Sequence, residues 1–372
     1  KLRVIISGGG TGGHIFPALS IADKLKELNP ETEILFVGAQ GRMEMEKVPA
    51  AGYKIEGLPV AGLQRKLTLS NFALPFKVLK SISMAKRLIR QFKPDIVIGV
   101  GGYASAPLLW AAGRLGIQEQ NGYAGLTNKI VGKKAKSICV AYDGMERFFP
   151  AERIVFTGNP IRKEIVPATA QMREEAMKFY GLDPEKKHIF IVGGSLGSGT
   201  LNNAMKKWIS DGCPGGESIE IIWQCGKFYK PSVDAFMEEA KSKGLGGACL
   251  AQIQHSDFIK RMDLAYAAAD VVISRSGASS VSELCAAHKA TIFVPSPNVA
   301  EDHQTHNAMA LVNKDAAVLI KDSEAVEKLL PAACELIENT GKIALLEKNI
   351  AVLARTDAAM TIAEETYRII GK

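Results

Sequence analysis

Three glycine-rich segments in the sequence have the composition of phosphate-binding loops. They are 8–14 (GGGTGGH), 99–103 (GVGGY) and 193–197 (GGSLG), and each begins at the end of a short apolar run. Glycine lets the backbone approach a phosphate closely, and a helix that starts directly after the loop offers free N–H groups and the positive end of its dipole. We expect three such loops to hold a ligand, or a pair of ligands, that carries several phosphates.

The first loop also satisfies the G-x-G-x-x-G spacing of dinucleotide-binding proteins. In that class of protein, an acidic residue at the end of the second strand binds the adenosine ribose. Here the apolar run 34–38 is followed instead by Ala39 and Gln40. The sequence therefore disfavours a dehydrogenase.

Short β-branched runs that end near Gly or Pro predict the strands that must position these loops. Most are followed by apolar residues at helical spacing, so we expect parallel sheets joined by right-handed crossovers. The pattern restarts near residue 187, after a charged stretch at 159–185. This predicts two doubly wound, Rossmann-like α/β domains whose parallel sheets face one another across a cleft, with ligands at the carboxyl ends of the strands. The predicted strands are 4–7, 34–38, 96–100, 189–192, 219–223, 271–274 and 291–295.

Composition places the chain among globular proteins. It has 372 residues, of which 47% are hydrophobic and 23% charged. The six cysteines are scattered without C-x-x-C spacing, so we expect a reduced compartment with neither disulfides nor zinc. The first residues lead directly into a strand pattern, and we expect no signal peptide. The uncharged stretch 96–113 is long enough to span a membrane, but its Gly and Pro residues predict a strand, a loop and a helix.

The basic residues are unevenly distributed. No acidic residue occurs between Glu56 and Asp95, a window that holds eight Lys and Arg residues and many large apolar ones. A basic, amphipathic segment from Leu67 to Lys93 suits the surface of an anionic bilayer. The alternative is a helix pair whose apolar face is simply part of the core.

Seven segments, in order along almost the whole chain, resemble the MurG family of peptidoglycan UDP-N-acetylglucosamine transferases. They are 9–17 (GGTGGHIFP), 99–104 (GVGGYA), 119–129 (EQNGYAGLTNK), 158–162 (GNPIR), 193–197 (GGSLG), 275–284 (RSGASSVSEL) and 302–307 (DHQTHN). The resemblance implies the two-domain fold called GT-B. It implies an acceptor-binding, membrane-associating domain at 1–159, joined by a C-terminal helix at 358–372, and a donor domain at 160–357.

The resemblance also implies an activity. It is an inverting glycosyltransferase that moves GlcNAc from UDP-GlcNAc to the C4 hydroxyl of MurNAc in undecaprenyl-diphosphate-MurNAc-pentapeptide, a step in peptidoglycan synthesis and hence in cell shape and division. The implied location is peripheral, on the cytoplasmic face of the bacterial cell membrane. Other cell-wall synthesis proteins are candidate partners, and we expect no nucleic-acid partner. UDP-GlcNAc is a co-substrate, and no cofactor is expected.

On the acceptor side, the resemblance makes His14 the catalytic base or an acceptor-binding group. An imidazole at the mouth of a glycine loop could take a proton from a hydroxyl. The plainer interpretation is a residue that caps the helix start. The expected residues that bind the acceptor or its phosphates are Thr11, Gly12, Gly13, Gly101, Gly102 and Tyr103.

On the donor side, Arg162 is expected to bind the diphosphate, because the guanidinium fork matches phosphate oxygens. Ser195 would complete that cradle, and Glu283 would accept the uridine ribose hydroxyls. The alternatives are an interdomain salt bridge for Arg162 and a capping role for Glu283. The remaining donor contacts implied are Phe258, Ile259 and Met262 at the uracil, and Asn121, His303 and Gln304 at the sugar.

The sequence departs from the family pattern in three places. The stretch 116–121 has fewer apolar residues, and a real shortening would truncate a strand there. Leu196 and His303 stand where relatives carry Gln. The chain also lacks Asp-x-Asp, the usual metal–diphosphate clamp of the other main glycosyltransferase fold, so we expect no bound metal and activity without Mg²⁺.

Three other functions remain as alternatives at this stage. A UDP-GlcNAc 2-epimerase would share the donor site but needs no basic, apolar surface. A non-catalytic nucleotide-sugar binding module would not depend on His14. A related transferase could act on diacylglycerol or another lipid acceptor.

Overall fold

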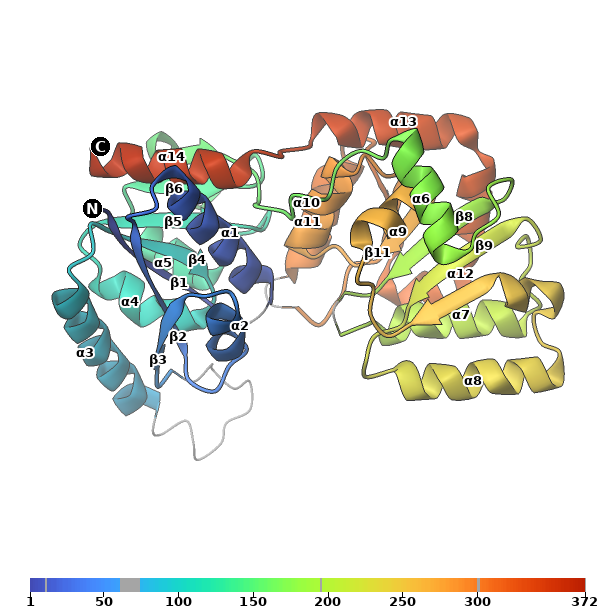
Figure 1. Cartoon of the computed structure of the whole chain (residues 1–372), viewed down its shortest axis with the longest axis horizontal. Helices are drawn as coiled ribbons and strands as arrows, with labels where there is room; N and C mark the ends of the chain where they lie inside the picture. Colours follow the sequence, from blue (N-terminus) through green and yellow to red (C-terminus); the bar gives the residue numbers. More distant parts are fainter. Residues whose placement is uncertain (11, 61–73, 195, 300–301, 372) are drawn as a thin grey trace. The chain divides into compact units, whose positions relative to one another are not determined.

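The chain forms two compact units (Figure 1). A computed structural model describes residues 1–10, 12–60, 74–194, 196–299 and 302–371. The first unit comprises Lys1–Ile161 and Arg355–Lys372, and the second comprises Arg162–Ala354. We expected the boundary directly after residue 159.

The first unit is built on a seven-stranded sheet in the order β3-β2-β1-β4-β5-β6-β7, with every pair parallel. The chain moves from β1 outward to β3 and then returns to β4, so the loops after β1 and β4 turn in opposite directions. Such a switch point is where doubly wound sheets bind ligands. The strands are β1 (Arg3–Gly8), β2 (Glu33–Ala39), β3 (Lys54–Leu58), β4 (Ile96–Gly101), β5 (Leu115–Glu119), β6 (Ser137–Val140) and β7 (Ile154–Phe156).

Helices cover both faces of this sheet. Buried side chains from α1 and the C-terminal helix α14 fill one core, and those from α3, α4 and α5 fill the other. Helix α14 lies beside α1 in Figure 1, and Ile362 and Ala363 bury it against the first core. The helices are α1 (Gly12–Leu28), α2 (Glu44–Ala50), α3 (Leu74–Phe92), α4 (Ala106–Ala111), α5 (Leu126–Gly132) and α14 (Ala358–Ile370).

The second unit repeats the plan with a six-stranded parallel sheet, in the order β10-β9-β8-β11-β12-β13. Its switch point lies between β8 and β11. The strands are β8 (Lys187–Val192), β9 (Ile219–Gln224), β10 (Ile253–Ser256), β11 (Val271–Ser274), β12 (Thr291–Phe293) and β13 (Val318–Leu319). The helices are α6 (Ala170–Tyr180), α7 (Gly199–Ser210), α8 (Lys230–Lys243), α9 (Met262–Ala268), α10 (Ala278–Ala286), α11 (His303–Val312), α12 (Asp322–Glu338) and α13 (Thr340–Val352).

All seven predicted strands are present, and the prediction of doubly wound α/β domains is confirmed. Six further strands within the described ranges are not among the predicted ones, because they are short or carry polar residues. Strand β5 forms in the stretch where we expected a shortening. Residues 115–117 pair with β4 and residues 116–119 with β6, although Gln118 and Glu119 are polar and buried.

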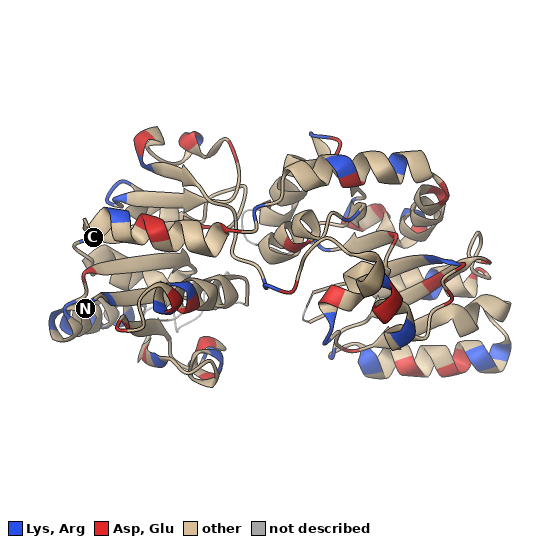
Figure 2. Cartoon of the chain, turned by 45° about the horizontal axis from the view of Figure 1, so that its top comes forward, with Lys and Arg blue, Asp and Glu red and all other residues tan. Residues whose placement is uncertain are grey.

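The uncharged stretch 96–113 forms β4, the short 3₁₀ helix Tyr103–Ser105 and α4, as predicted. None of the helices in the described ranges is long and apolar enough to cross a membrane. Charged residues lie mainly on helices and loops, while the strands are largely uncharged (Figure 2). All six cysteines are buried thiols.

Candidate active site

In the first unit, His14 is held by the glycine loop that precedes it. The loop links β1 to α1, and His14 is the third residue of that helix. Its imidazole Nδ1 lies 3.2 Å from the carbonyl oxygen of Gly9. Because a carbonyl only accepts, this contact favours the tautomer with the proton on Nδ1, in which Nε2 is the basic nitrogen.

The second glycine loop lies against the other edge of the imidazole. Gly101 and Gly102, at the end of β4, have φ values of +102° and +87°, a region where a side chain is strained. A Cβ on Gly101 would come within 3.0 Å of His14 Nε2, so the imidazole packs directly on this backbone. The tyrosine ring of Tyr103 lies close to Gly10 of the first loop. The structure therefore brings both predicted loops to one edge of the sheet.

A buried polar network continues this edge beyond the imidazole. Gln118 Nε2 donates to Asn159 Oδ1 at 2.9 Å, and Asn159 Nδ2 donates to the carbonyl of Gln120 at 3.0 Å. The side-chain oxygen of Gln120 faces Gly101 beside His14. None of the three residues was predicted, and each is about 98% or more buried.

Asn121, a predicted sugar contact, lies in the first unit and is held by Glu119. The buried carboxylate of Glu119 accepts from the backbone N–H of Asn121 at 3.0 Å. It also accepts from the N–H of Gly125 at 3.0 Å and from Asn128 Nδ2 at 2.8 Å. This carboxylate fixes the whole turn that follows β5.

In the second unit, the third glycine loop is held by Gln224 at the end of β9. The side-chain oxygen of Gln224 accepts from the N–H of Gly193, and its amide donates to the carbonyl of Gly194. The neighbouring Leu196 is 74% exposed. Thr11 and Ser195, which we predicted in the first and third loops, lie outside the described residues.

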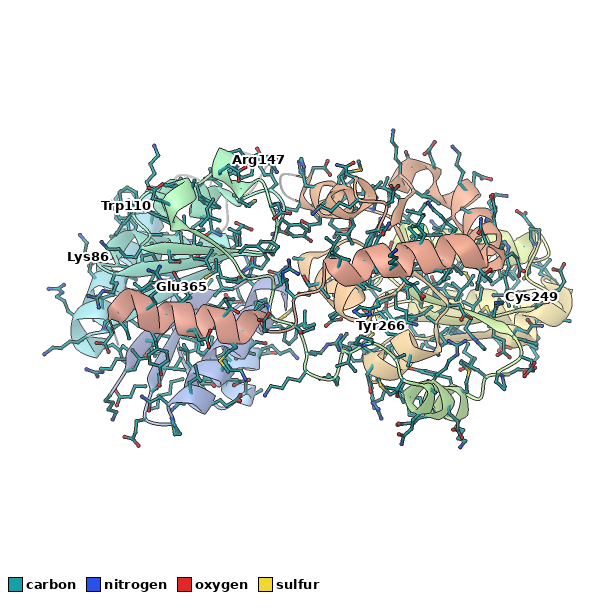
Figure 3. The ribbon with its side chains drawn as sticks, turned by 90° about the horizontal axis from the view of Figure 1, so that it is seen from above. Lys86, Trp110, Arg147, Cys249, Tyr266 and Glu365 are labelled. Carbon is teal, nitrogen blue, oxygen red and sulfur yellow. The ribbon has the colours of Figure 1, made fainter. Side chains whose placement is uncertain are left out.

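Arg162 and Glu283 form a bidentate ion pair within the second unit. Arg162 Nε donates to Glu283 Oε1 at 2.8 Å, and Nη2 donates to Oε2 at 2.7 Å. Tyr266, labelled in Figure 3, adds its hydroxyl to Oε2 at 3.4 Å. Residues that we assigned to different parts of the donor thus bind one another here. Arg162 remains 43% exposed along its side chain, while Glu283 is buried.

The pKa values of Arg162 and of the neighbouring Tyr266 phenol are both raised. Burial lowers the pKa of Arg162, but the hydrogen bonds and charge of Glu283 outweigh burial, so the pKa is raised overall. The phenol of Tyr266 is buried against the Glu283 carboxylate, and both burial and that charge raise its pKa. Both shifts favour the protonated forms of Arg162 and Tyr266 at neutral pH.

Gln304 lies at the start of α11 and is hydrogen-bonded to the loops after β11 and β12. Its side-chain oxygen accepts from the backbone N–H of Ser276 at 3.3 Å and of Ser296 at 2.9 Å. Both hydrogen bonds use the side-chain oxygen, which therefore is occupied by protein donors. His303 Nδ1 is buried and, within the described ranges, has no hydrogen-bond partner.

The three predicted uracil contacts lie between β10 and the first turn of α9. Phe258 is 57% exposed, whereas Ile259 is 6% exposed and belongs to the core. Met262 opens α9 and is half-buried. An exposed phenyl ring suits stacking against the flat face of a base. Among the described residues, no group of three or more His, Cys, Asp or Glu side chains is placed to hold a metal ion.

Sequence comparison matches two family models to the two units. The glycosyltransferase family 28 N-terminal domain matches residues 4–140, and the C-terminal domain of the same family matches residues 188–362. The chain belongs to glycosyltransferase family 28. The predicted resemblance and the assignment as a glycosyltransferase are thereby confirmed.

Relatives and solved structures agree with this membership. The UDP-N-acetylglucosamine--N-acetylmuramyl-(pentapeptide) pyrophosphoryl-undecaprenol N-acetylglucosamine transferase of Parabacteroides distasonis is 52% identical, over 100% of this chain and 99% of that protein. The crystal structure of Acinetobacter baumannii MurG matches with a TM-score of 0.77 and 28% identity, over 99% of this chain and 100% of the other. The UDP-GlcNAc 2-epimerase of Neisseria meningitidis matches with a TM-score of 0.65 and 12% identity, over 99% of this chain and 100% of the other. At this identity the match shows a shared fold alone.

Proposed function

We propose that this transferase moves GlcNAc from UDP-GlcNAc to the C4 hydroxyl of MurNAc in a lipid-linked muramyl-pentapeptide diphosphate. The first unit binds the acceptor and the second binds the donor. The assignment of His14 as the catalytic base rests on the position of its two ring nitrogens. Nδ1 lies at hydrogen-bond distance from the Gly9 carbonyl, and Nε2 faces the second glycine loop. The relative from P. distasonis, named for this reaction, supports the choice of substrates.

The chemistry follows from the tautomer of His14. The acceptor hydroxyl oxygen bonds to the anomeric carbon of GlcNAc from the face opposite the UDP oxygen, the bond to UDP breaks, and Nε2 takes the hydroxyl proton. UDP leaves with the electron pair, and the product has the inverted, β configuration. The N–H groups of Gly12 and Gly13 lie in the first turn of α1, where no intrahelical acceptor is available, and they suit the acceptor diphosphate.

In the second unit, the Arg162 guanidinium is the cation that we assign to the donor diphosphate. Its partner Glu283 still has lone pairs for the ribose hydroxyls, because each carboxylate oxygen can accept more than one hydrogen bond. Phe258 covers the uracil, and the Gln304 amide donates to the sugar. The proposal includes no bound metal.

The acceptor assignment is tested with labelled UDP-GlcNAc and two lipids, a short-chain lipid-linked muramyl-pentapeptide diphosphate and a diacylglycerol. Transfer to the muramyl lipid is expected, because we assign the glycine loops of the first unit to a diphosphate that diacylglycerol lacks. Transfer to diacylglycerol alone would overturn the assignment. A third reaction without acceptor measures C2 epimerisation of UDP-GlcNAc, and turnover there would favour an epimerase.

We also propose that the first unit associates with the cytoplasmic surface of an anionic membrane. Large apolar side chains are exposed on three helices of its α3–α4–α5 face: Phe76 and Leu79 on α3, Trp110 on α4 and Ile130 on α5. Each is at least 55% exposed, and Trp110 is labelled in Figure 3. The described part of the basic segment, residues 74–93, has no acidic residue (Figure 2). Its basic residues are Lys77, Lys80, Lys86, Arg87, Arg90 and Lys93.

The two interpretations of the basic segment apply to different turns of α3. Toward its C-terminal end, Met84, Leu88, Ile89 and Phe92 pack against the core. Near its N-terminal end, Phe76 and Leu79 are left to solvent beside lysines. Residues 61–73 of the segment lie outside the described residues. The membrane proposal therefore rests on the start of α3 together with α4 and α5.

Replacing Leu79 and Trp110 with serine is expected to weaken binding to anionic vesicles at least about tenfold, because burying one large apolar side chain contributes about 1.5–3 kcal/mol. Co-sedimentation with vesicles of phosphatidylglycerol and phosphatidylcholine measures the partition coefficient. Phe179→Ser is the matched control, since Phe179 is 57% exposed on α6 of the second unit. Binding of the double variant equal to that of the wild type would contradict the proposal.

A further inference from the structure

Glu44 is a fully buried acidic residue at the start of α2, and it accepts hydrogen bonds from two separate backbone segments. Its Oε1 accepts from the N–H of Ala39, at the end of β2, at 3.0 Å. Its Oε2 accepts from the N–H of Gly10, in the first glycine loop, at 3.0 Å. No Lys or Arg among the described residues forms an ion pair with Glu44. The carboxylate therefore interacts with the loop through backbone amides.

The N–H of Gly10 and the carbonyl of Gly9 belong to the same peptide group. Glu44 accepts from its N–H end, and the carbonyl end accepts from His14 Nδ1 at 3.2 Å. Carboxylate, peptide group and imidazole thus form one series of hydrogen bonds. Each hydrogen bond in such a series polarises the next one.

Two glycines make room for this series. A Cβ on Gly9 would overlap the carboxylate of Glu44, and a Cβ on Gly102 would overlap the carbonyl oxygen of Gly9. Gly102 also has a φ of +87°, which disfavours any side chain there. The two glycine loops are therefore fitted around the peptide group that joins Glu44 to His14.

We propose that Glu44 is a positioning residue that acts on His14 through the Gly9–Gly10 peptide group. The carboxylate polarises the peptide, which strengthens the Gly9 carbonyl as an acceptor and holds the proton of His14 on Nδ1. Nε2 then faces the acceptor hydroxyl as a base, and the positive charge that forms on the imidazole is stabilised by the polarised carbonyl. Aspartate does the same for histidine directly in serine proteases, and here a peptide group stands between the two.

The hydrogen bond from Gly10 to Glu44 also limits which groups of the loop can bind an anion. The N–H of Gly10 is occupied by Glu44 and does not donate to a phosphate. The anion-binding groups of this loop are therefore those at the start of α1, farther from the carboxylate. The inference about His14 deepens the proposed function and rests on it.

The direct test is the tautomer of His14 in the full-length protein. With ¹⁵N-labelled histidine, two-bond ¹H–¹⁵N correlations distinguish a protonated Nδ1 from a protonated Nε2, and the spectrum of His14→Gln identifies the His14 signals. We expect the wild type to carry its proton on Nδ1. Protonation mainly on Nε2 in the wild type would overturn the proposal without any Glu44 variant having to fold.

The variant Glu44→Gln removes the charge and leaves a single side-chain acceptor for two amides. We expect kcat to fall about 10- to 100-fold, as for loss of a charge-assisted hydrogen bond, with KM for UDP-GlcNAc unchanged and His14 a mixture of tautomers. Glu46→Gln is the matched control, since Glu46 is an exposed carboxylate on the same helix.

Two other results with Glu44→Gln would contradict the proposed positioning of His14 by Glu44. One is an unchanged His14 tautomer with unchanged kcat. The other is lower thermal stability and lower kcat with the tautomer intact, which would make Glu44 a structural residue only. If the wild type fails to transfer GlcNAc to any muramyl lipid, the proposed function is wrong. The tautomer measurement still shows whether Glu44 positions the proton of His14.

Discussion

The variant His14→Ala is expected to lower kcat about 10²- to 10⁴-fold, the usual contribution of a positioned general base. KM for UDP-GlcNAc should stay near the wild-type value, because the donor contacts that we assign to Arg162 and Glu283 lie in the second unit. The proton of the attacking hydroxyl would have no acceptor other than water. Steady-state kinetics with the muramyl lipid measure both constants.

The control for His14→Ala is His255→Ala. His255 is a mostly buried histidine that pairs with Asp234 at 2.7 Å, and we assign it no role in the reaction. Its replacement should leave kcat close to wild type. A His14→Ala enzyme with wild-type kcat would identify His14 as a residue that caps α1. Another group would then have to accept the hydroxyl proton.

The variant Glu283→Gln is expected to weaken UDP binding about 10- to 150-fold, because it removes charge-assisted hydrogen bonds that contribute about 1.5–3 kcal/mol. The neutral amide accepts at one atom only, so the ribose hydroxyls lose an acceptor and Arg162 loses its bidentate partner. Isothermal titration of the protein with UDP measures the dissociation constant. Glu164→Gln is the control, since Glu164 is an exposed carboxylate whose charge acts on Arg162.

Uridine separates the roles of the two partners in the ion pair. It carries the ribose but no phosphate. If Glu283 binds the ribose and Arg162 the diphosphate, Glu283→Gln weakens both uridine and UDP, while Arg162→Met weakens UDP and leaves uridine binding unchanged. A pair that is structural only would instead give two variants with equal losses for uridine and for UDP, which contradicts our assignment.

Part of the site could be predicted because its features are local. Glycine is strongly favoured where the backbone adopts a positive φ or another segment approaches it closely, so the loops containing Gly10, Gly101 and Gly194 were visible as runs of glycine. The central strands β1, β4 and β8 were visible too, because a strand buried on both faces consists almost entirely of apolar residues. His14 follows such a loop directly, and its position therefore needed no tertiary information.

Other parts could not be predicted, because the partners are far apart in sequence. Arg162 and Glu283 are separated by 121 positions, and we assigned them to different parts of the donor rather than to each other. Strand β5 was hard to recognise because its polar residues are satisfied by distant partners, such as Asn159 for Gln118. The signal that could have been used is a polar residue at the carboxyl end of a strand, which also applies to Gln224 and Glu119.

The amino-acid sequence alone determined the two α/β domains, the glycine loops, the family and the identity of most candidate residues, since these depend on local backbone preference, apolar periodicity and motif order. Only the tertiary structure decided which groups hold one another. The clearest case is Glu44, which lies 34 positions from Gly10 and in no motif that we recognised. A hydrogen bond depends on where two chain segments meet in space, and no local pattern of residues specifies that meeting.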